Sequence, residues 1–218
     1  MPIEEHVRRV RILARSAGRR AIDAIELGDP DSPTRALVVG CIHGNEPAGI
    51  AIAKALVRQA RISEADLWVI PDLNPDGVAA DTRGNGHGVD LNRNFPARWR
   101  PLGAPGTTYY AGPRPLSEPE SASLAALVHT IRPQLTIYYH QHLAVVDDSQ
   151  GPPAIERAYA TDVGLPLRPL TDYPGSATGW QDALLGRTAF VVELPPGPLG
   201  RAHIDAHVDA LLDVLPAG

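Results

Sequence analysis

The chain has 218 residues, of which 44% are hydrophobic and 21% are charged, and its formal net charge at pH 7 is -5. This composition is that of a soluble globular protein, and the length suits one compact domain, expected over residues 1–218. The acidic balance argues against a nucleic-acid partner, and no apolar run is long enough for a membrane span.

The N-terminal stretch MPIEEHVRRVRILARSAGRR has no uninterrupted apolar core, so we do not expect it to act as a signal peptide. Its arginines are most simply explained as the solvated face of a helix. The single cysteine, Cys41, cannot form an internal disulfide and fits a reducing compartment. We therefore expect a cytoplasmic protein, and the sequence does not indicate its oligomeric state.

In chain order, the first third predicts two strands, a helix and a third strand. The strands are expected over residues 20–27, 35–41 and 66–72, and the last two are short apolar runs typical of buried strands. Helical spacing covers residues 46–60, with Pro47 in the first turn, where its missing N–H costs nothing. This order is typical of helices packed on a mainly parallel sheet.

Residues 74–116 are rich in Gly, Pro, Asn and Arg and show no clear period. A structureless segment of this length is uncommon in a compact domain and is often functional. Beyond it we predict a helix over 117–132, a strand over 134–140, a helix over 153–164, a strand over 188–194 and a helix from about 201 to 214. The prediction is an α/β fold with a mainly parallel, mixed and twisted sheet and helices on both faces.

Polar side chains follow three of the predicted strands. His43 and Glu46 come after RALVVGC, His140 and His142 come after QLTIYY, and Glu193 lies near the end of TAFVVEL. Ligands of open α/β sheets bind at the carboxyl ends of the strands, so these groups are expected to converge. Histidines and carboxylates bind zinc, and a catalytic zinc site uses three protein ligands and leaves one position for water.

Two choices stay open at this point. Glu193 either forms a structural ion pair or acts as a general base near the metal, where it could take the proton of a zinc-bound water and transfer it to a leaving amine. The third ligand is either His140 or His142, because residues two apart in an extended chain point to the same face.

The segment GVDLNRNFP places Asp90, Asn92, Arg93 and Asn94 within five positions. A solvated loop would account for these polar residues. Recognition of a carboxylate is the alternative, because an arginine presents a planar fork of donors that matches a carboxylate.

Six pieces of the chain resemble, in order and spacing, the zinc metallocarboxypeptidase family: GRRAIDAIELG, HGNEPAG, NPDG, RGNGHGVDLNRNFP, YYHQHL and VVELPPG. They extend from Gly18 to Gly197, and GVDLNRNFP is the most specific of them. The short motifs are similar to those of the bacterial murein peptide amidase branch, which cuts the bond between γ-D-glutamate and meso-diaminopimelate in released peptidoglycan peptides. Longer digestive carboxypeptidases match less well, since this chain is too short for their insertions.

The resemblance implies one zinc ion per chain. His43 and Glu46 match the first two ligands of the family, and His140 matches the third, with His142 as the alternative. Asp90 matches a residue that orients the first zinc histidine through its other ring nitrogen.

The resemblance also implies the catalytic and substrate-binding residues. Glu193 matches the general base and acid, and Arg83 matches the arginine that polarises the scissile carbonyl and stabilises its oxyanion. Asn92 and Arg93 match the pair that holds the carboxylate of a small peptide substrate. The expected enzyme is a zinc-dependent amidase or peptidase that acts next to a carboxylate-bearing residue, most simply in murein peptides.

Three alternatives use the same residues. A general metallocarboxypeptidase is disfavoured by the short chain, and an N-acyl-amino-acid deacylase of the desuccinylase or aspartoacylase kind is disfavoured by NPDG and VVELPPG. A catalytically inactive zinc-binding module would be expected to lack Glu193 or Arg83, and both are present.

Two positions depart from the family pattern. Asn45 stands where the carboxypeptidases often have an arginine between the first two ligands, which removes one cation from the site. A tyrosine that caps the substrate is expected after Trp180, and none lies there. Tyr173, earlier in the chain, is the alternative.

Overall fold

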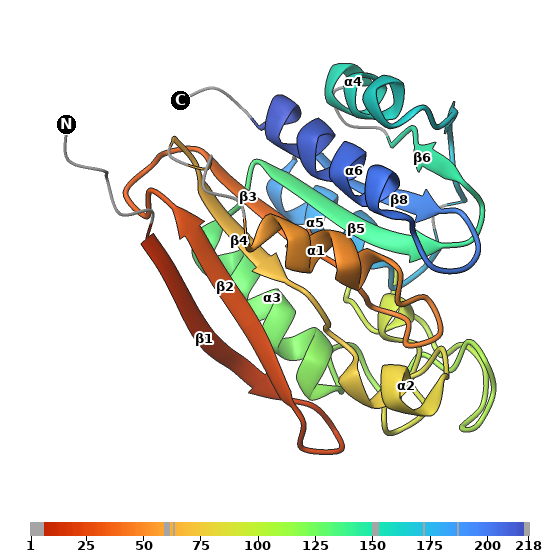
Figure 1. Ribbon diagram of the computed structural model, residues 1–218. Helices are drawn as coiled ribbons and strands as arrows, with labels where there is room; N and C mark the ends of the chain where they lie inside the picture. Colours follow the sequence, from red (N-terminus) through yellow and green to blue (C-terminus); the bar gives the residue numbers. More distant parts are fainter. Residues whose placement is uncertain are drawn as a thin grey trace.

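A computed structural model describes residues 7–58, 62, 64–149, 153–171, 173–186 and 188–215. In this part of the chain an eight-stranded sheet has the order β1-β2-β4-β3-β5-β8-β6-β7 (Figure 1). The strands are β1 (Val7–Arg15), β2 (Ala21–Gly28), β3 (Arg35–Val39), β4 (Asp66–Ile70), β5 (Leu135–Gln141), β6 (Val145–Asp147), β7 (Leu167–Arg168) and β8 (Thr188–Leu194).

The centre of this sheet is parallel, antiparallel pairs lie on both sides of it, and the edge pair β6–β7 is parallel again. β3 pairs in parallel with β4 and β5, and β5 pairs in parallel with β8. β2 pairs antiparallel with β1 and β4, and β6 pairs antiparallel with β8. Every residue of β4 and β5 is buried, which is why these strands read as continuous apolar runs in the sequence.

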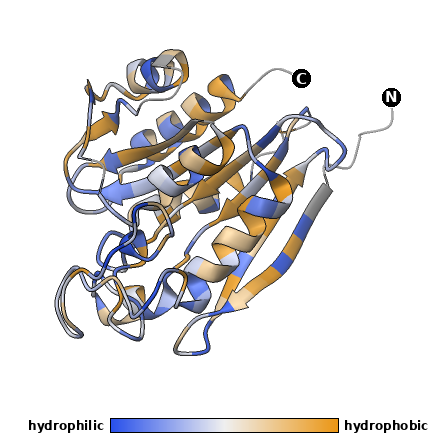
Figure 2. Ribbon diagram, turned by 180° about the vertical axis from the view of Figure 1, so that it is seen from behind, coloured by the Kyte–Doolittle hydropathy of each residue, from blue (hydrophilic) through white to orange (hydrophobic). Residues whose placement is uncertain are grey.

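Helices cover both faces of the sheet (Figure 1). On one face lie α1 (Gly49–Leu56), α4 (Pro153–Val163) and α6 (Arg201–Val214), and on the other lie α3 (Pro119–Ile131) and α5 (Ala177–Leu185). Each face has its own buried apolar cluster. Figure 2 shows the central strands as mainly hydrophobic. The predicted fold class, one α/β domain with a mixed sheet between helices, is confirmed.

The arginine-rich N-terminus forms the edge strand β1, so the prediction of a helix there is wrong. Side chains alternate along β1 with the period of a strand. Arg9 and Arg11 lie on one face, where they form ion pairs with Glu26 of β2, at 3.8 and 3.2 Å. Val10 and Ile12 lie on the other face and are exposed. Among the described residues, no helix has the length and apolar character that crossing a membrane requires.

Several element boundaries differ from the prediction. α1 begins at Gly49, so Pro47 precedes the helix and does not lie in its first turn. The residues from His43 to Glu46 form a turn instead, in which the Glu46 N–H donates to the His43 carbonyl at 2.9 Å. The predicted end of this helix, at residue 60, lies outside the described residues, and α1 itself ends at Leu56. The short elements β6 and β7, and the helix α5, were not predicted.

Glu156 of α4 is a buried carboxylate. Its Oε1 accepts a hydrogen bond from the Ser149 hydroxyl, and its Oε2 has no partner among the described residues. Burial raises the pKa of Glu156 from 4.5 to about 7. Since the folded state then holds a proton that the unfolded state has released, the free energy of unfolding should fall as the pH rises from about 4.5 to about 7.

We expect Glu156→Gln to remove part of this fall, because the variant has no charge to bury. The difference in unfolding free energy between pH 5 and pH 8, measured by urea denaturation, should shrink by on the order of 1 kcal/mol. The exposed Asp162→Asn on the same helix is the control and should behave like the wild type. An unchanged pH dependence in Glu156→Gln would contradict the prediction.

Candidate metal centre and substrate cavity

Three side chains with metal-binding groups converge at the carboxyl end of the sheet. His43 lies in the loop after β3, Glu46 precedes α1, and His140 lies near the end of β5. Glu46 Oε2 is 3.0 Å from His43 Nδ1 and 2.9 Å from His140 Nδ1, and the two Nδ1 atoms are 3.1 Å apart. All three residues are buried, and their ligand atoms lie within 4.8 Å of one another. Two imidazoles and a carboxylate are a donor set that suits zinc, so these residues fit a metal ion.

The structure separates the two histidines of HQH. β5 ends at Gln141, so the alternation that would give both histidines the same direction ends before His142. Within the described chain, only His140 joins His43 and Glu46 in the cluster, and His142 lines the wider cavity. Gln141 was not predicted as a site residue. Its amide accepts from the Ala48 N–H and donates to the carbonyls of Pro195 and Gly197, at 2.9–3.0 Å, which joins the ends of β5 and β8 to the start of α1.

The turn that carries His43 and Glu46 packs directly on α2 (Pro75–Ala80). A Cβ at Gly44 would lie 1.9 Å from the carbonyl carbon of Gly77, so only glycine allows this approach. Asn74 caps α2 by accepting from the Gly77 N–H at 3.0 Å. The amide of Asn74 donates to the carbonyls of Ile42 and Arg83, at 3.1 and 3.3 Å. The NPDG motif therefore connects the metal-site turn to the segment that contains Arg83.

Asp90 fixes the orientation of His43. The Oδ1 atom of Asp90 lies 3.0 Å from His43 Nε2, so the other ring nitrogen, Nδ1, faces Glu46 and His140. Burial alone would raise the pKa of Asp90, but His43 and Arg83 outweigh it and hold this pKa well below its usual range. Asp90 is therefore ionised and suited to hold a ligand histidine in one orientation.

Arg83 lies beside the same cluster. Its Nε donates to Asp90 Oδ2 at 2.8 Å, and its Nη1 donates to Glu46 Oε1 at 3.0 Å. These bonds use two of the five N–H donors of a guanidinium. The side chain is 20% exposed and lines the cavity, so the remaining donors can serve a substrate oxygen.

The segment GVDLNRNFP forms the short 3-10 helix η1 (Leu91–Arg93), which Asp90 caps by accepting from the Asn92 N–H. Asn92 Oδ1 accepts from the Ala177 N–H at 2.8 Å, so the NH₂ group of the same side chain remains to donate to a ligand in the cavity. Arg93 is only 5% exposed, and burial lowers its pKa below the usual value. No described carboxylate forms a salt bridge with Arg93. A buried guanidinium that forms no salt bridge and lies beside an amide donor is suited to an incoming carboxylate.

Two tyrosines flank this guanidinium. The Arg93 Cζ atom lies 4.3 Å from the centre of the Tyr173 ring and 5.9 Å from that of Tyr109, which is also 5.4 Å from the Arg83 Cζ. Gly175 has φ +75°, and a Cβ there would lie 2.2 Å from the Arg93 carbonyl oxygen, so glycine lets the Tyr173 segment pack on η1. Tyr173, the alternative for the missing tyrosine, therefore lies in the cavity. Tyr109 was not predicted.

Hydrogen bonds from asparagine side chains hold the turns within residues 74–116 in place. Asn94 donates to the Ala111 and Arg114 carbonyls at 2.8 and 3.0 Å. Asn85 donates to Glu118 and Glu120 of the α3 region, at 2.8 and 2.9 Å. The segment is therefore not structureless: it contains α2 and η1, and asparagines hold the turns between them.

Glu193 lies one strand away from His140. β5 and β8 pair in register, His140 opposite Glu193, so both side chains lie on one face of the sheet. The Leu143 N–H donates to Glu193 Oε2 at 3.4 Å, and no described cation forms a salt bridge with Glu193. The structural ion-pair interpretation therefore has no support in the described chain.

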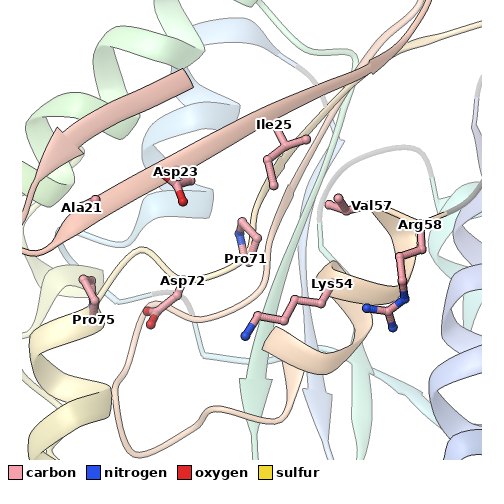
Figure 3. Close-up of a pocket in the computed structure, with 9 residues that line it drawn as sticks. All are labelled: Ala21, Asp23, Ile25, Lys54, Val57, Arg58, Pro71, Asp72 and Pro75. Atoms are coloured by element: carbon pink, nitrogen blue, oxygen red, sulfur yellow. The ribbon is translucent and has the colours of Figure 1, made fainter. Parts of the chain in front are cut away.

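These residues line a cavity of ≈ 1040 Å³. Its wall includes all seven predicted site residues: His43, Glu46, Arg83, Asn92, Arg93, His140 and Glu193. A smaller cavity of ≈ 490 Å³ lies between β2, α1, the segment that follows β4 and the start of α2, and no histidine lines it. Figure 3 shows Lys54 and Asp72 turned towards its space.

Residues 4–146 match the model of the zinc carboxypeptidase family. The chain belongs to this family. As a zinc carboxypeptidase family member it is a hydrolase of the metallopeptidase class. It is 32% identical over 177 residues to murein peptide amidase A of Escherichia coli K12, covering 73% of this chain and 71% of the relative. It is 31% identical over 204 residues to murein peptide amidase A of Vibrio campbellii, covering 85% of this chain and 79% of the relative.

Solved structures agree with this assignment. The crystal structure of murein-tripeptide amidase MpaA from Escherichia coli O157 superposes with a TM-score of 0.79 at 26% identity, covering 98% of this chain and 94% of the other. Carboxypeptidase A from Helicoverpa armigera superposes with a TM-score of 0.80 at 18% identity, covering 95% and 68%, which shows the shared fold.

Proposed function

We propose that this enzyme uses zinc to hydrolyse the amide bond next to a carboxylate-bearing residue, with the γ-D-glutamyl–meso-diaminopimelate bond of murein peptides as its substrate. One observation carries the proposal: a cluster of three metal-binding side chains, a carboxylate on the adjacent strand and a buried guanidinium all line one cavity. The two murein peptide amidases to which the chain is similar support the choice of substrate.

His43, Glu46 and His140 would hold one zinc ion per chain. When bound, zinc acts as a Lewis acid on the scissile carbonyl and lowers the pKa of a coordinated water. The two hydrogen bonds from the histidines outweigh burial and lower the pKa of Glu46 below its usual value, so that it is ionised as a metal ligand must be.

The substrate is positioned from the opposite wall of the cavity. Arg93 binds the free carboxylate of the residue to be released, and the NH₂ group of Asn92 adds a further donor. Tyr173 lies against the Arg93 guanidinium and covers the bound carboxylate from the solvent side. Because the bound substrate is held in one orientation, the reacting groups do not have to meet by diffusion. This positioning supplies a large part of the rate enhancement.

Glu193 acts first as the general base and then as the general acid of the proposed reaction. It takes a proton from the attacking water, whose oxygen forms a bond to the carbonyl carbon and converts it to a tetrahedral intermediate. Arg83 donates to the oxyanion of this intermediate. Glu193 then gives the proton to the departing nitrogen as the carbon–nitrogen bond breaks. The products are the shortened peptide acid and an amino acid with a free amine.

A panel of four substrates tests the proposal against its alternatives. The zinc-loaded enzyme is given L-Ala-γ-D-Glu-meso-diaminopimelate, the same tripeptide with its C-terminal carboxylate amidated, an ordinary acetylated α-dipeptide, and N-succinyl and N-acetyl amino acids as a fourth class. We expect kcat/KM for the free tripeptide to exceed that for the amidated tripeptide by at least about 100-fold, since an unpaired Arg93 penalises a substrate that lacks the carboxylate. It should also exceed kcat/KM for the α-dipeptide and the acyl amino acids, which keep a carboxylate but lack the γ-D-glutamyl–diaminopimelate bond.

Other outcomes of this panel identify the alternatives. Faster cleavage of the α-dipeptide would indicate a general metallocarboxypeptidase, and faster cleavage of the acyl amino acids would indicate a deacylase. Equal cleavage of the free and amidated tripeptides would remove Arg93 from substrate binding.

A further inference from the structure

The smaller cavity, of ≈ 490 Å³, lies apart from the proposed active site. No residue assigned to the metal or to the substrate lines it, and its volume lies within the range of sites that bind small molecules. Its wall comes from β2, from the end of α1, from the segment that follows β4 and from the start of α2. The cavity is therefore a separate feature of the fold, with its own set of side chains.

One part of this wall is apolar. Ile25 of β2, Val57 at the end of α1 and Pro71 after β4 all line the cavity. Val10 of the edge strand β1 lies opposite Ile25 in the β1–β2 pair, and its side chain is 57% exposed. Because directly opposite residues of an antiparallel pair share one face of the sheet, the apolar surface continues from the cavity to the edge strand.

Four charged side chains also line the cavity, and they come from different elements. Asp23 belongs to β2 and Asp72 follows β4, whereas Lys54 lies in the last turn of α1 and Arg58 lies two residues beyond this helix. In the view of Figure 3, both carboxylates lie on one side of the Lys54 ammonium group and the Arg58 guanidinium lies on the other. Within the described chain, neither cation forms a salt bridge with these carboxylates.

Asp72 is half-buried, whereas the other three charged side chains are exposed. Burial raises the pKa of Asp72 to about 6, although the Asn74 N–H and the charge of Lys54 act in the opposite direction. The Asn74 N–H donates to Asp72 Oδ1 at 2.9 Å. A carboxylate can accept about four hydrogen bonds, so this bond leaves capacity for a ligand. An ammonium group beside Asp72 would replace hydration that burial has removed and would favour the charged carboxylate.

A small zwitterion with an apolar body suits all parts of this wall. Its ammonium group would bind Asp72, its carboxylate would bind Lys54 and Arg58, and its apolar part would lie on Ile25 and Val57. A ligand with only one sign of charge would face groups of its own sign on one side of the cavity, which disfavours its binding. A free amino acid carries both charges on one carbon and leaves its side chain to contact the apolar surface.

We infer that the cavity between β2, α1 and α2 is a second binding site, which takes a free amino acid with an apolar side chain. The inference does not depend on the proposed reaction, because the residues that line this cavity take no part in it. Since three of the four charged side chains are exposed, we expect an affinity in the millimolar range.

Lys54 is the only lysine in the sequence, so protein made with ¹³C-labelled lysine gives the NMR signals of one lysine side chain. Zinc-loaded enzyme is titrated with L-leucine at about pH 7.5, where Asp72 is mostly ionised. The signal of Lys54 should shift and reach saturation. Leucine amide and N-acetylleucine each lack one of the two charges and should need at least about 10-fold higher concentrations. The absence of a saturating shift with leucine, or an equal response to all three compounds, would overturn the inference.

Variants show whether the acidic part of the wall takes part in binding. Asp72→Asn keeps the size of the side chain and an acceptor for the Asn74 N–H, and it should raise the leucine concentration at half-saturation by about 10-fold. Asp23→Asn changes an exposed position and should raise this concentration by a smaller factor. The control is Asp162→Asn on α4, which lies outside the cavity and should behave like the wild type. Wild-type binding by both cavity variants would overturn the inference.

Arg93→Gln separates this cavity from the larger one. The variant removes the guanidinium that is proposed to bind a carboxylate there, and the shift of the Lys54 signal should persist in it unchanged. Loss of the shift in Arg93→Gln would overturn the inference, because leucine would then act from the larger cavity.

Discussion

Glu193→Gln is expected to lower kcat for tripeptide hydrolysis by roughly 10²- to 10⁴-fold, the usual contribution of a general acid–base group. Glutamine keeps the size of the side chain and its place opposite His140 on β8, but it cannot take a proton from water. Because Glu193 is not one of the three clustered residues, the variant should still bind one zinc per chain. Single-turnover kinetics and elemental analysis of the same sample measure both quantities.

A Glu193→Gln variant that retains more than about a tenth of kcat would show that another group moves the proton. A variant that loses zinc together with activity would instead place Glu193 among the ligands. Either result would contradict the proposal that His43, Glu46 and His140 bind zinc while Glu193 transfers the proton.

His140→Ala should abolish activity by weakening zinc binding at least about 100-fold, more than is usual for residues that only support a ligand. The matched variant is His142→Ala, which removes the other histidine of the same short segment. It should keep one zinc per chain, because His142 lies outside the cluster of His43, Glu46 and His140. Competition with a chelating dye measures both affinities.

Thermal unfolding gives a readout of His140→Ala that is independent of catalysis. A ligand that binds only the folded state raises the melting temperature, so zinc should stabilise the wild type and His142→Ala but not His140→Ala. The opposite pattern, with zinc lost in His142→Ala, would reverse the assignment of the third ligand.

The central part of this fold is predictable because its strands are buried on both faces. For that reason the sequence shows apolar runs at β3, β4, β5 and β8. The parallel pairing of these strands brings their carboxyl ends to one edge of the sheet. The approach of His43, Glu46, His140 and Glu193 follows from these two facts alone. Their assignment as a zinc site gains specificity only from the family resemblance.

The other parts of the fold and of the site depend on contacts between segments that lie far apart in the sequence. The arginine-rich start of the chain, considered alone, suits the solvated face of a helix, and only its pairing with β2 shows that β1 is a strand. Tyr173 reaches Arg93 through the close approach of Gly175 to η1, which no local pattern encodes. β6 and α5 are too short or too weakly patterned to be predicted from the sequence.

A zinc titration of tripeptide hydrolysis tests the proposed zinc-dependent reaction most directly. Metal-free enzyme would be mixed with increasing zinc and L-Ala-γ-D-Glu-meso-diaminopimelate, and free diaminopimelate would be followed by mass spectrometry. We expect no release without metal, a rise proportional to added zinc, and a plateau at one equivalent per chain. Release by the metal-free enzyme, or zinc bound at one per chain with no diaminopimelate released, would contradict the proposal.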